Sequence, residues 1–254
     1  MIAQKRTARR NRKTSDDNRR GRGVYEQLRT LIITGGLAPG SPIIERPFAA
    51  RLGVSRGSLR DALRRLEHEG FVSATAAGVY SRAVVTPLTV ADMDDIYTVI
   101  AALDGAAARK AAQLPDPDRR RIAESMTAVN KRLAAALAAP GGTSQMVYDL
   151  DREFHMAYLT SVGGPRLRAL YDAISLQGER YGRAYSSALG HFPAVGGLAL
   201  ASTQEHRAIA DAIRGSNPDA AEQAASANWR NAASRLRVLI ASAGERGSFF
   251  GDAE

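Results

Sequence analysis

The 254-residue sequence contains no cysteine. This absence excludes disulfide frameworks, thiolate metal sites and cysteine nucleophiles. The chain also lacks any run of about eighteen apolar residues, the length at which a membrane helix becomes a candidate. The apolar stretch of a signal peptide does not follow the basic N-terminus. We therefore expect a cytoplasmic protein with no membrane partner, and its 44% apolar content is enough for one large or two ordinary folded domains.

The formal net charge of the chain is +9, but its C-terminal two thirds carry no excess of positive charge. Residues 1–22 carry a net +7, residues 23–86 carry +3 and residues 87–254 carry −1. This asymmetry favours a polyanionic partner for the first third of the protein. Nucleic acid fits better than a membrane surface, because no amphipathic apolar face accompanies the basic segment.

Residues 1–22 have almost no large apolar side chains, so burial cannot offset the entropy lost on ordering them. The composition predicts a disordered basic arm. Such an arm either adds phosphate or minor-groove contacts to a DNA complex or is a solvated start with no specific role.

Residues 55–69 have the pattern of one amphipathic helix. An N-cap serine, leucines at helical spacing and a terminating glycine define it, namely Ser55, Leu59, Leu63, Leu66 and Gly70. Its other face is cationic, with Arg56 and Arg60 four residues apart. Near the start of a helix that lies in the DNA major groove, such side chains reach base edges. The alternative interpretation of this face is a solvated basic surface with no DNA contact.

The segments around this helix predict a winged helix-turn-helix. A helix from Val24 to Ile32, a short strand at 43–44 and a short helix around 47–52 precede it. After Gly70, two strand-like segments flank Thr75 to Gly78, which is a hairpin signal. That hairpin is the expected wing.

A nearly gap-free series of residues then points to a family. The series comprises residues 37–40, Glu45, Arg46, residues 49–56, Leu59, Arg60, Ala62, Leu63, Leu66, Glu67 and Gly70. Through it, residues 23–85 resemble the winged helix-turn-helix domain of the GntR family of bacterial transcription regulators.

The resemblance implies roles for six residues on double-stranded operator DNA. It assigns the reading of bases to Arg46, Arg56 and Arg60 and contacts with phosphates to Ser55 and Ser58. It places Gly78 at the wing tip near the minor groove. The chemistry agrees, because an arginine fork matches guanine O6 and N7 while hydroxyl groups suit phosphates. Gly57 and Ser58 stand where relatives often carry Thr-Pro, which leaves the operator sequence open.

From residue 87 the pattern becomes helical, with Pro87 as a break and Thr89 with Asp92 as a capping box. Helices are expected at 90–112, 116–138, 144–160, 166–189, 200–214 and 218–243, with a Gly/Ala-rich loop at 190–199. No repeat of fixed period occurs, which favours an antiparallel bundle. The expected fold is mainly α, with a basic arm (1–22), a winged helix-turn-helix (23–86), a helical effector-binding and dimerisation domain (87–245) and a tail (246–254).

Four polar residues in the helical part form a constellation. Asp151 and His155 lie four apart, on one face of a helix. His206 shares a helix face with Ile209 and Ile213, and Asn228 follows on the last helix among small residues. Taken singly, each fits a hydrogen-bonded polar group of the core.

Together with neighbouring residues they resemble a known domain. The matching residues are 151–155, Glu205, His206, Ile209, Ala212, Ile213, Ala220 and Ala221. Through them, residues 90–240 resemble the FCD effector domain of the FadR subfamily of GntR regulators.

That resemblance implies a divalent metal of the zinc, nickel or manganese class, held by one aspartate and three histidines. Asp151, His155 and His206 match three of the ligands, and Asn228 stands at the fourth histidine position. An amide oxygen is a weaker ligand than imidazole, so a harder ion, or none, becomes the alternative to zinc.

A polar pocket inside an apolar bundle is the default ligand site. The resemblance implies a small carboxylate as effector, contacted by His155, His206, Asn228 and an arginine such as Arg109 or Arg180.

The sequence thus predicts a ligand-responsive transcription factor, not an enzyme, that represses from a palindromic operator as a homodimer. The alternatives are a metal-dependent hydrolase and a DNA-binding architectural protein without an effector.

Overall fold

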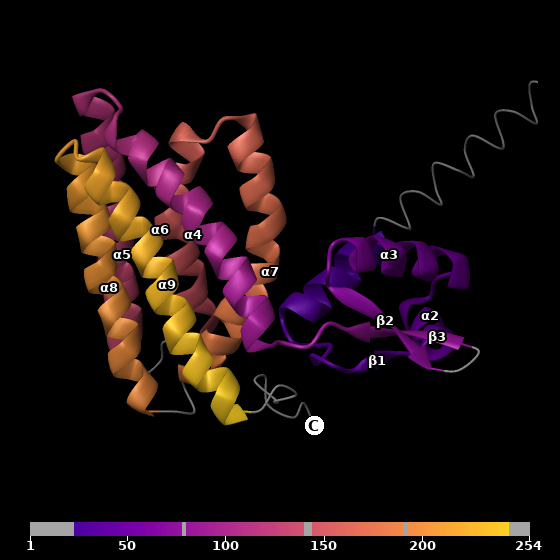
Figure 1. Cartoon of the computed structure of the whole chain (residues 1–254). Coiled ribbons are helices and arrows are strands. Elements are labelled where there is room, and N and C mark those ends of the chain that lie inside the picture. Colours follow the sequence, from indigo (N-terminus) through magenta and orange to yellow (C-terminus); the bar gives the residue numbers. More distant parts are fainter. Residues whose placement is uncertain (1–22, 78–79, 140–143, 190–192, 244–254) are drawn as a thin grey trace, which may run out of the picture. The chain divides into compact units, whose positions relative to one another are not determined.

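The computed structural model describes residues 23–77, 80–139, 144–189 and 193–243. The chain divides into two compact units, Met1–Pro87 and Leu88–Glu254, each of which is described by itself (Figure 1). None of the described helices is long and apolar enough to cross a membrane. The expected basic arm, the tail at 246–254 and the wing-tip Gly78 lie outside the described residues.

The first unit is a winged helix-turn-helix. A helix over residues 23–33 precedes the elements β1 (Pro42–Ile43), α2 (Glu45–Leu52), α3 (Arg56–His68), β2 (Val72–Ala77) and β3 (Tyr80–Val85). The strands form an antiparallel sheet in the order β1-β3-β2. The turn predicted over residues 75–78 is too long. Strand β2 continues through these residues to Ala77, with Thr75 paired with Arg82 and Ala77 with Tyr80. These additional antiparallel pairs extend the ladder of backbone hydrogen bonds.

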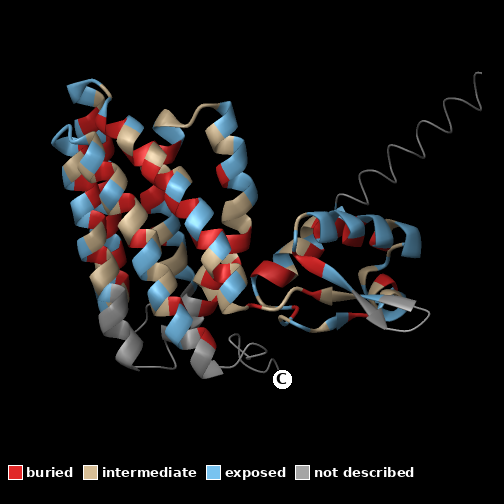
Figure 2. Ribbon diagram, viewed as in Figure 1, coloured by how far each residue is buried: buried red, intermediate tan, exposed pale blue. Residues whose placement is uncertain are grey.

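Local signals define both ends of α3. The Ser55 hydroxyl accepts a hydrogen bond from the Ser58 amide at 3.1 Å, as an N-cap residue should. Gly53 and Gly70 adopt positive φ angles of 64° and 80°, which L side chains rarely do. The leucine face is buried and the arginine face is exposed (Figure 2). The predicted amphipathic helix is confirmed.

The second unit is a bundle of helices, which confirms the mainly α prediction. Its described helices are α4 (Val90–Ala112), α5 (Asp116–Ala138), α6 (Ser144–Val162), α7 (Pro165–Leu189), α8 (Pro193–Arg214) and α9 (Pro218–Ala243). Thr89 caps α4 by accepting from the Asp92 amide at 3.2 Å. The expectation of a loop over 190–199 is wrong from Pro193 onward, because α8 begins there, where proline is favoured in a first helical turn.

Helix α4 lies at the centre of this bundle. It packs against α6, α7, α8 and α9 (Figure 1). It approaches α9 closely at Gly105, where an added Cβ would lie 2.4 Å from the Ser226 hydroxyl. Because α4 is buried on several sides, a polar residue on its inner face meets side chains from more than one helix. Asp104 is such a residue, with no exposed surface.

Candidate functional site

Three of the four constellation residues meet inside the helical unit. Asp151 and His155 project from α6 and His206 from α8, and the ligand atoms of the three lie within 4.8 Å of one another. His206 Nε2 is 3.5 Å from Asp151 Oδ1. Both histidines are buried, at 2% and 0% exposure. Side chains 55 residues apart in the chain thus converge on one small space.

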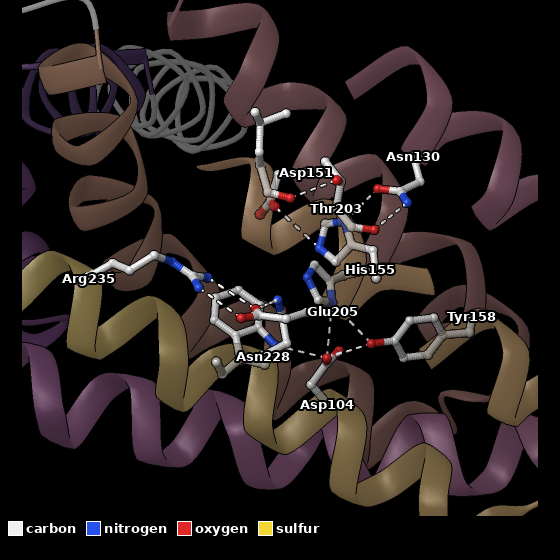
Figure 3. Close-up of polar contacts among 12 residues, drawn as sticks. Asp104, Asn130, Asp151, His155, Tyr158, Thr203, Glu205, Asn228 and Arg235 are labelled. Atoms are coloured by element: carbon white, nitrogen blue, oxygen red, sulfur yellow. Dashed lines mark hydrogen bonds and ion pairs between the residues drawn. The ribbon is translucent and has the colours of Figure 1, made fainter. Parts of the chain in front are cut away.

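Asp104 of α4 sets the orientation of the His155 ring. His155 Nδ1 lies 3.0 Å from Asp104 Oδ2, which also accepts from Tyr158 Oη at 2.5 Å and Trp229 Nε1 at 2.8 Å (Figure 3). An ionised carboxylate can only accept, so the Nδ1 atom of His155 carries the proton. In the neutral form of this ring, the Nε2 lone pair of His155 is left for a ligand or metal.

Asn130 of α5 orients His206 so that its Nδ1 atom, like that of His155, is the donor. The Asn130 amide nitrogen donates to the Thr203 carbonyl oxygen at 2.8 Å, which directs Asn130 Oδ1 to His206 Nδ1 at 3.2 Å (Figure 3). His206 Nδ1 is therefore the donor and Nε2 has the lone pair. Among the residues that the structure describes, buried His206 Nε2 has no hydrogen-bond partner. The Phe154 ring stacks on the His206 ring, with 3.9 Å between the ring centroids, and holds it in place.

The two imidazoles differ in basicity. Complete burial, together with the charges of His155 and Arg235, lowers the pKa of His206 well below its ordinary value. Burial also acts to lower the pKa of His155, but the carboxylates of Asp104 and Asp151 outweigh it and raise that pKa. His206 is therefore a neutral imidazole, the form that binds metals.

These residues fit a divalent metal ion. A carboxylate and two imidazole nitrogens converge, both rings present Nε2, and each Nδ1–H is held by a buried partner. The Nε2 atom of His206, which no described residue satisfies with a hydrogen bond, is the atom that an ion would satisfy.

Asn228 belongs to a different contact. It is buried, and its amide nitrogen donates to Glu205 Oε2 at 2.8 Å. Glu205 also accepts from Asn231 and Arg235 (Figure 3). The amide nitrogen of Asn228 is thus bonded to a carboxylate of α8, whereas the atom that would bind a metal is the amide oxygen.

A cavity of about 90 Å³ opens beside the cluster. Asp151 and His155 line it at one side, and its walls are mostly aliphatic and aromatic, including Tyr97, Leu133 and Trp229. An apolar cavity of about 150 Å³ holds benzene, so this one suits a ligand of only a few carbon atoms.

The structure does not bring the two expected effector arginines to this cavity. Arg109 forms ion pairs with Asp219 and, at 3.0 Å, with Glu222 of α9. Arg180 is buried elsewhere in the bundle, where desolvation lowers its pKa despite nearby Tyr181 and Asp92. Arginines that do line the cavity in the described part of the domain are Arg152 and Arg235.

The expected DNA-contacting residues of the first unit are displayed at the surface. Arg46, Arg56 and Arg60 are exposed. Arg60 Nε donates to both carboxylate oxygens of Glu45, at 3.0 and 2.8 Å. Ser55 is engaged as the helix cap, and its hydroxyl lies 2.9 Å from that of Ser58. The contact between Glu45 and Arg60 was not predicted from the sequence.

The sequence analysis also assigned no role in the site to Asp104, Asn130, Glu205 and Arg235. One signal was available for Asp104, which interrupts the apolar face that Ala101 and Ala108 continue on α4. An acidic residue there needs buried donors. The other three depend on contacts between helices that the sequence pattern does not reveal.

Comparisons with known proteins identify the family. Residues 20–77 match the description "Bacterial regulatory proteins, gntR family", and residues 95–231, more than half of the chain, match the FCD domain. The chain therefore belongs to the GntR family of bacterial transcription regulators and carries an FCD domain.

Individual relatives agree with this assignment. The chain is 26% identical over 222 residues to the HTH-type transcriptional regulator YdhC of Bacillus subtilis (strain 168), covering 85% of this chain and 90% of that protein. It is 24% identical over 213 residues to a Paenarthrobacter nicotinovorans protein that carries the name of a D-xylose utilization operon transcriptional repressor, with 79% and 83% covered. These relatives are regulators, not enzymes.

Solved structures match in fold. A GntR transcriptional regulator from Rhodococcus sp. RHA1 has a TM-score of 0.61 at 22% identity, covering 85% of this chain and 97% of that one. McbR/YncC of E. coli has a TM-score of 0.58 at 16% identity, with 87% and 98% covered.

Proposed function

We propose that this regulator is a repressor that binds a palindromic operator as a homodimer and is released or re-oriented by a small carboxylate in its helical domain. The observation that carries this proposal is the convergence of Asp151, His155 and His206 beside a small cavity. Among the described residues, a buried imidazole nitrogen has no hydrogen-bond partner, and two members of its cluster, Asp151 and His155, line a cavity; this suits a binding site better than a packed core.

The metal part of the proposal rests on the donor set. Asp151, His155 and His206 would hold a divalent ion of the zinc, nickel or manganese class, and Asn228 stays a weaker candidate because an amide oxygen is a weaker ligand than an imidazole nitrogen. A bound ion would supply a positive charge that attracts a carboxylate. His155 and His206 orient the site through their buried partners.

The DNA part of the proposal assigns base reading to Arg46, Arg56 and Arg60, and phosphate contact to Ser55 and Ser58. The exposed arginine face of α3 supports it, since α3 has the helix-turn-helix position of a recognition helix. A single short helix reads few base pairs, so a two-fold symmetric dimer on a palindrome is proposed. Operator binding in a bacterium implies a cytoplasmic location.

The competing function is a DNA-binding architectural protein that has no effector. Metal analysis and thermal unfolding of the full chain separate the two, because a ligand that binds only the native state raises its apparent stability. We expect a bound divalent ion and stabilisation by a small monocarboxylate. A metal-free protein that no member of a carboxylate panel stabilises would support the architectural role instead.

A further inference from the structure

One carboxylate of α8 receives four hydrogen bonds from α9. Glu205 accepts from Asn228 at 2.8 Å, from Asn231 at 2.9 Å and from both terminal nitrogens of Arg235 at 2.9 and 3.2 Å (Figure 3). The side chains of Arg235 and Glu205 are only 10% and 20% exposed. A bidentate pair with so little solvent around it holds the guanidinium in one orientation.

This pair joins the helix that carries His206 to a residue of the cavity wall. Glu205 directly precedes His206 in α8, and Arg235 lines the same cavity as Asp151 and His155. Arg235 and two of the three candidate metal ligands thus border one cavity.

Arg235 has donors left for a second anion. A guanidinium carries five N–H groups, and Glu205 uses one on each terminal nitrogen. An anion in the cavity can therefore bind Arg235 while Glu205 remains in place. Holding a long side chain in advance lowers the entropy lost when the anion binds.

We propose that Arg235, positioned by Glu205, is the anion-binding residue of the cavity, and that Asn228 supports this pair and is not a metal ligand. The ligand is a carboxylate whose oxygens contact both the ion and Arg235. The inference rests on the proposed metal and effector site, and it replaces the arginines expected from the sequence by one that lines the cavity.

The charges of the pair predict opposite effects on metal binding, which can be tested with zinc alone in competition with a chromophoric chelator. In Glu205→Gln the charge of Arg235 is no longer balanced, and zinc affinity falls about five- to tenfold. In Arg235→Gln the uncompensated Glu205 raises zinc affinity by about the same factor, and the double variant returns near the wild-type value. Asn228→Ala changes it by less than about threefold, because no ligand is lost.

The outcomes separate this inference from the proposed function. A wild-type protein that binds no zinc contradicts the proposed metal site itself. Zinc binding by the wild type, with a large loss in Asn228→Ala or a loss in both Glu205→Gln and Arg235→Gln, overturns the inference and leaves the metal site standing. A purely structural role of the pair would produce that uniform loss.

The anion role is tested with acetate on the zinc-loaded full chain, by calorimetry. We expect acetate binding to weaken about tenfold or more in Arg235→Gln, because a charged hydrogen bond is removed. Arg132→Gln is the matched control, since Arg132 is an exposed arginine of α5 that pairs with Glu153 and does not line the cavity, and it should change acetate binding less than about twofold. Equal losses in the two variants, or no acetate binding to the wild type, would overturn the role of Arg235.

Discussion

His155 donates its Nδ1–H to Asp104 across 3.0 Å, and this contact joins α6 to α4 through two buried side chains. Helix α4 begins at Val90, directly after the segment that ends the DNA-binding unit at Pro87. A change in the ligands of His155 is therefore expected to act on Asp104 of α4, the first helix of the second unit. Helix α4 thus links the candidate site, along the chain, to the end of the DNA-binding unit.

The Asp104 contact predicts a role in metal binding without direct coordination. In Asp104→Asn the shape is kept, but the charge that orients His155 is lost, and metal affinity should fall about 10- to 100-fold. Competition with a chromophoric chelator measures this change. Asp149→Asn is the control, because Asp149 is an exposed aspartate of α6 bonded to Gln145, and it should leave metal affinity unchanged. Equal losses in both variants would mean that overall charge, not the His155 contact, is responsible.

Metal binding should stabilise the folded protein. At an ion concentration of about 100 times the dissociation constant, the gain is about 2.7 kcal/mol. For a unit of this size, that corresponds to a melting temperature about 5–10 °C higher. His206→Gln should abolish the increase, because one ligand is removed, whereas His68→Gln, at an exposed position of α3, should keep it. Differential scanning fluorimetry with and without zinc decides between these outcomes, and an unchanged increase in His206→Gln would contradict the ligand assignment.

Arg56 is expected to read a base. Arg56→Ala should cost about 1–3 kcal/mol of binding to the preferred DNA sequence and far less on random DNA. Fluorescence anisotropy on both DNAs measures the difference. Arg64→Ala is the control, since Arg64 is exposed on the same helix but paired with Asp61 at 3.0 Å. Equal loss on the two DNAs would assign Arg56 to phosphate contact only.

The Glu45–Arg60 pair predicts an effect on sequence preference. Glu45 engages Nε of Arg60 and leaves the two terminal nitrogens for a bidentate base contact. Glu45→Gln should therefore weaken the preference at one base position by about three- to tenfold, a fraction of a full bidentate contact. It should also strengthen non-specific binding, because a negative charge near phosphates is removed.

Selection from a random DNA pool measures this preference position by position. The position that Glu45→Gln relaxes should be the one that Arg60→Ala relaxes, and the double variant should add little. Asp61→Asn removes a similar exposed charge from α3 and should relax no position. If Glu45→Gln and Arg60→Ala affect different positions, the pair has no role in base reading.

The helices were largely predictable because local signals mark their ends. Proline and glycine breaks at 115, 163–165 and 215–218 coincide with observed helix ends, and Ser55 and Thr89 cap α3 and α4 as expected. The start of α8 was not predictable from composition, since glycine and alanine near 193–199 fit a loop or a helix. There the fold overrides a weak local preference.

The candidate site was only partly predictable. Spacing placed Asp151 and His155 on one helix face, and the apolar register of α8 turned His206 inward. The partner of Asn228 could not be inferred, because the α8–α9 contact with Glu205 depends on how two helices pack. The same applies to the choice of arginine, since Arg235 faces the cavity and Arg109 faces Asp219.

The central claim is that a carboxylate bound at the Asp151, His155 and His206 site controls DNA binding. The most direct test is the affinity of the metal-loaded full chain for its selected DNA sequence, with and without the carboxylate that stabilises it most. We predict a change in affinity of about 5- to 150-fold, a coupling of about 1–3 kcal/mol, that is lost in His155→Gln. A carboxylate that stabilises the protein but leaves its DNA affinity within about twofold, well below such coupling, would contradict the account.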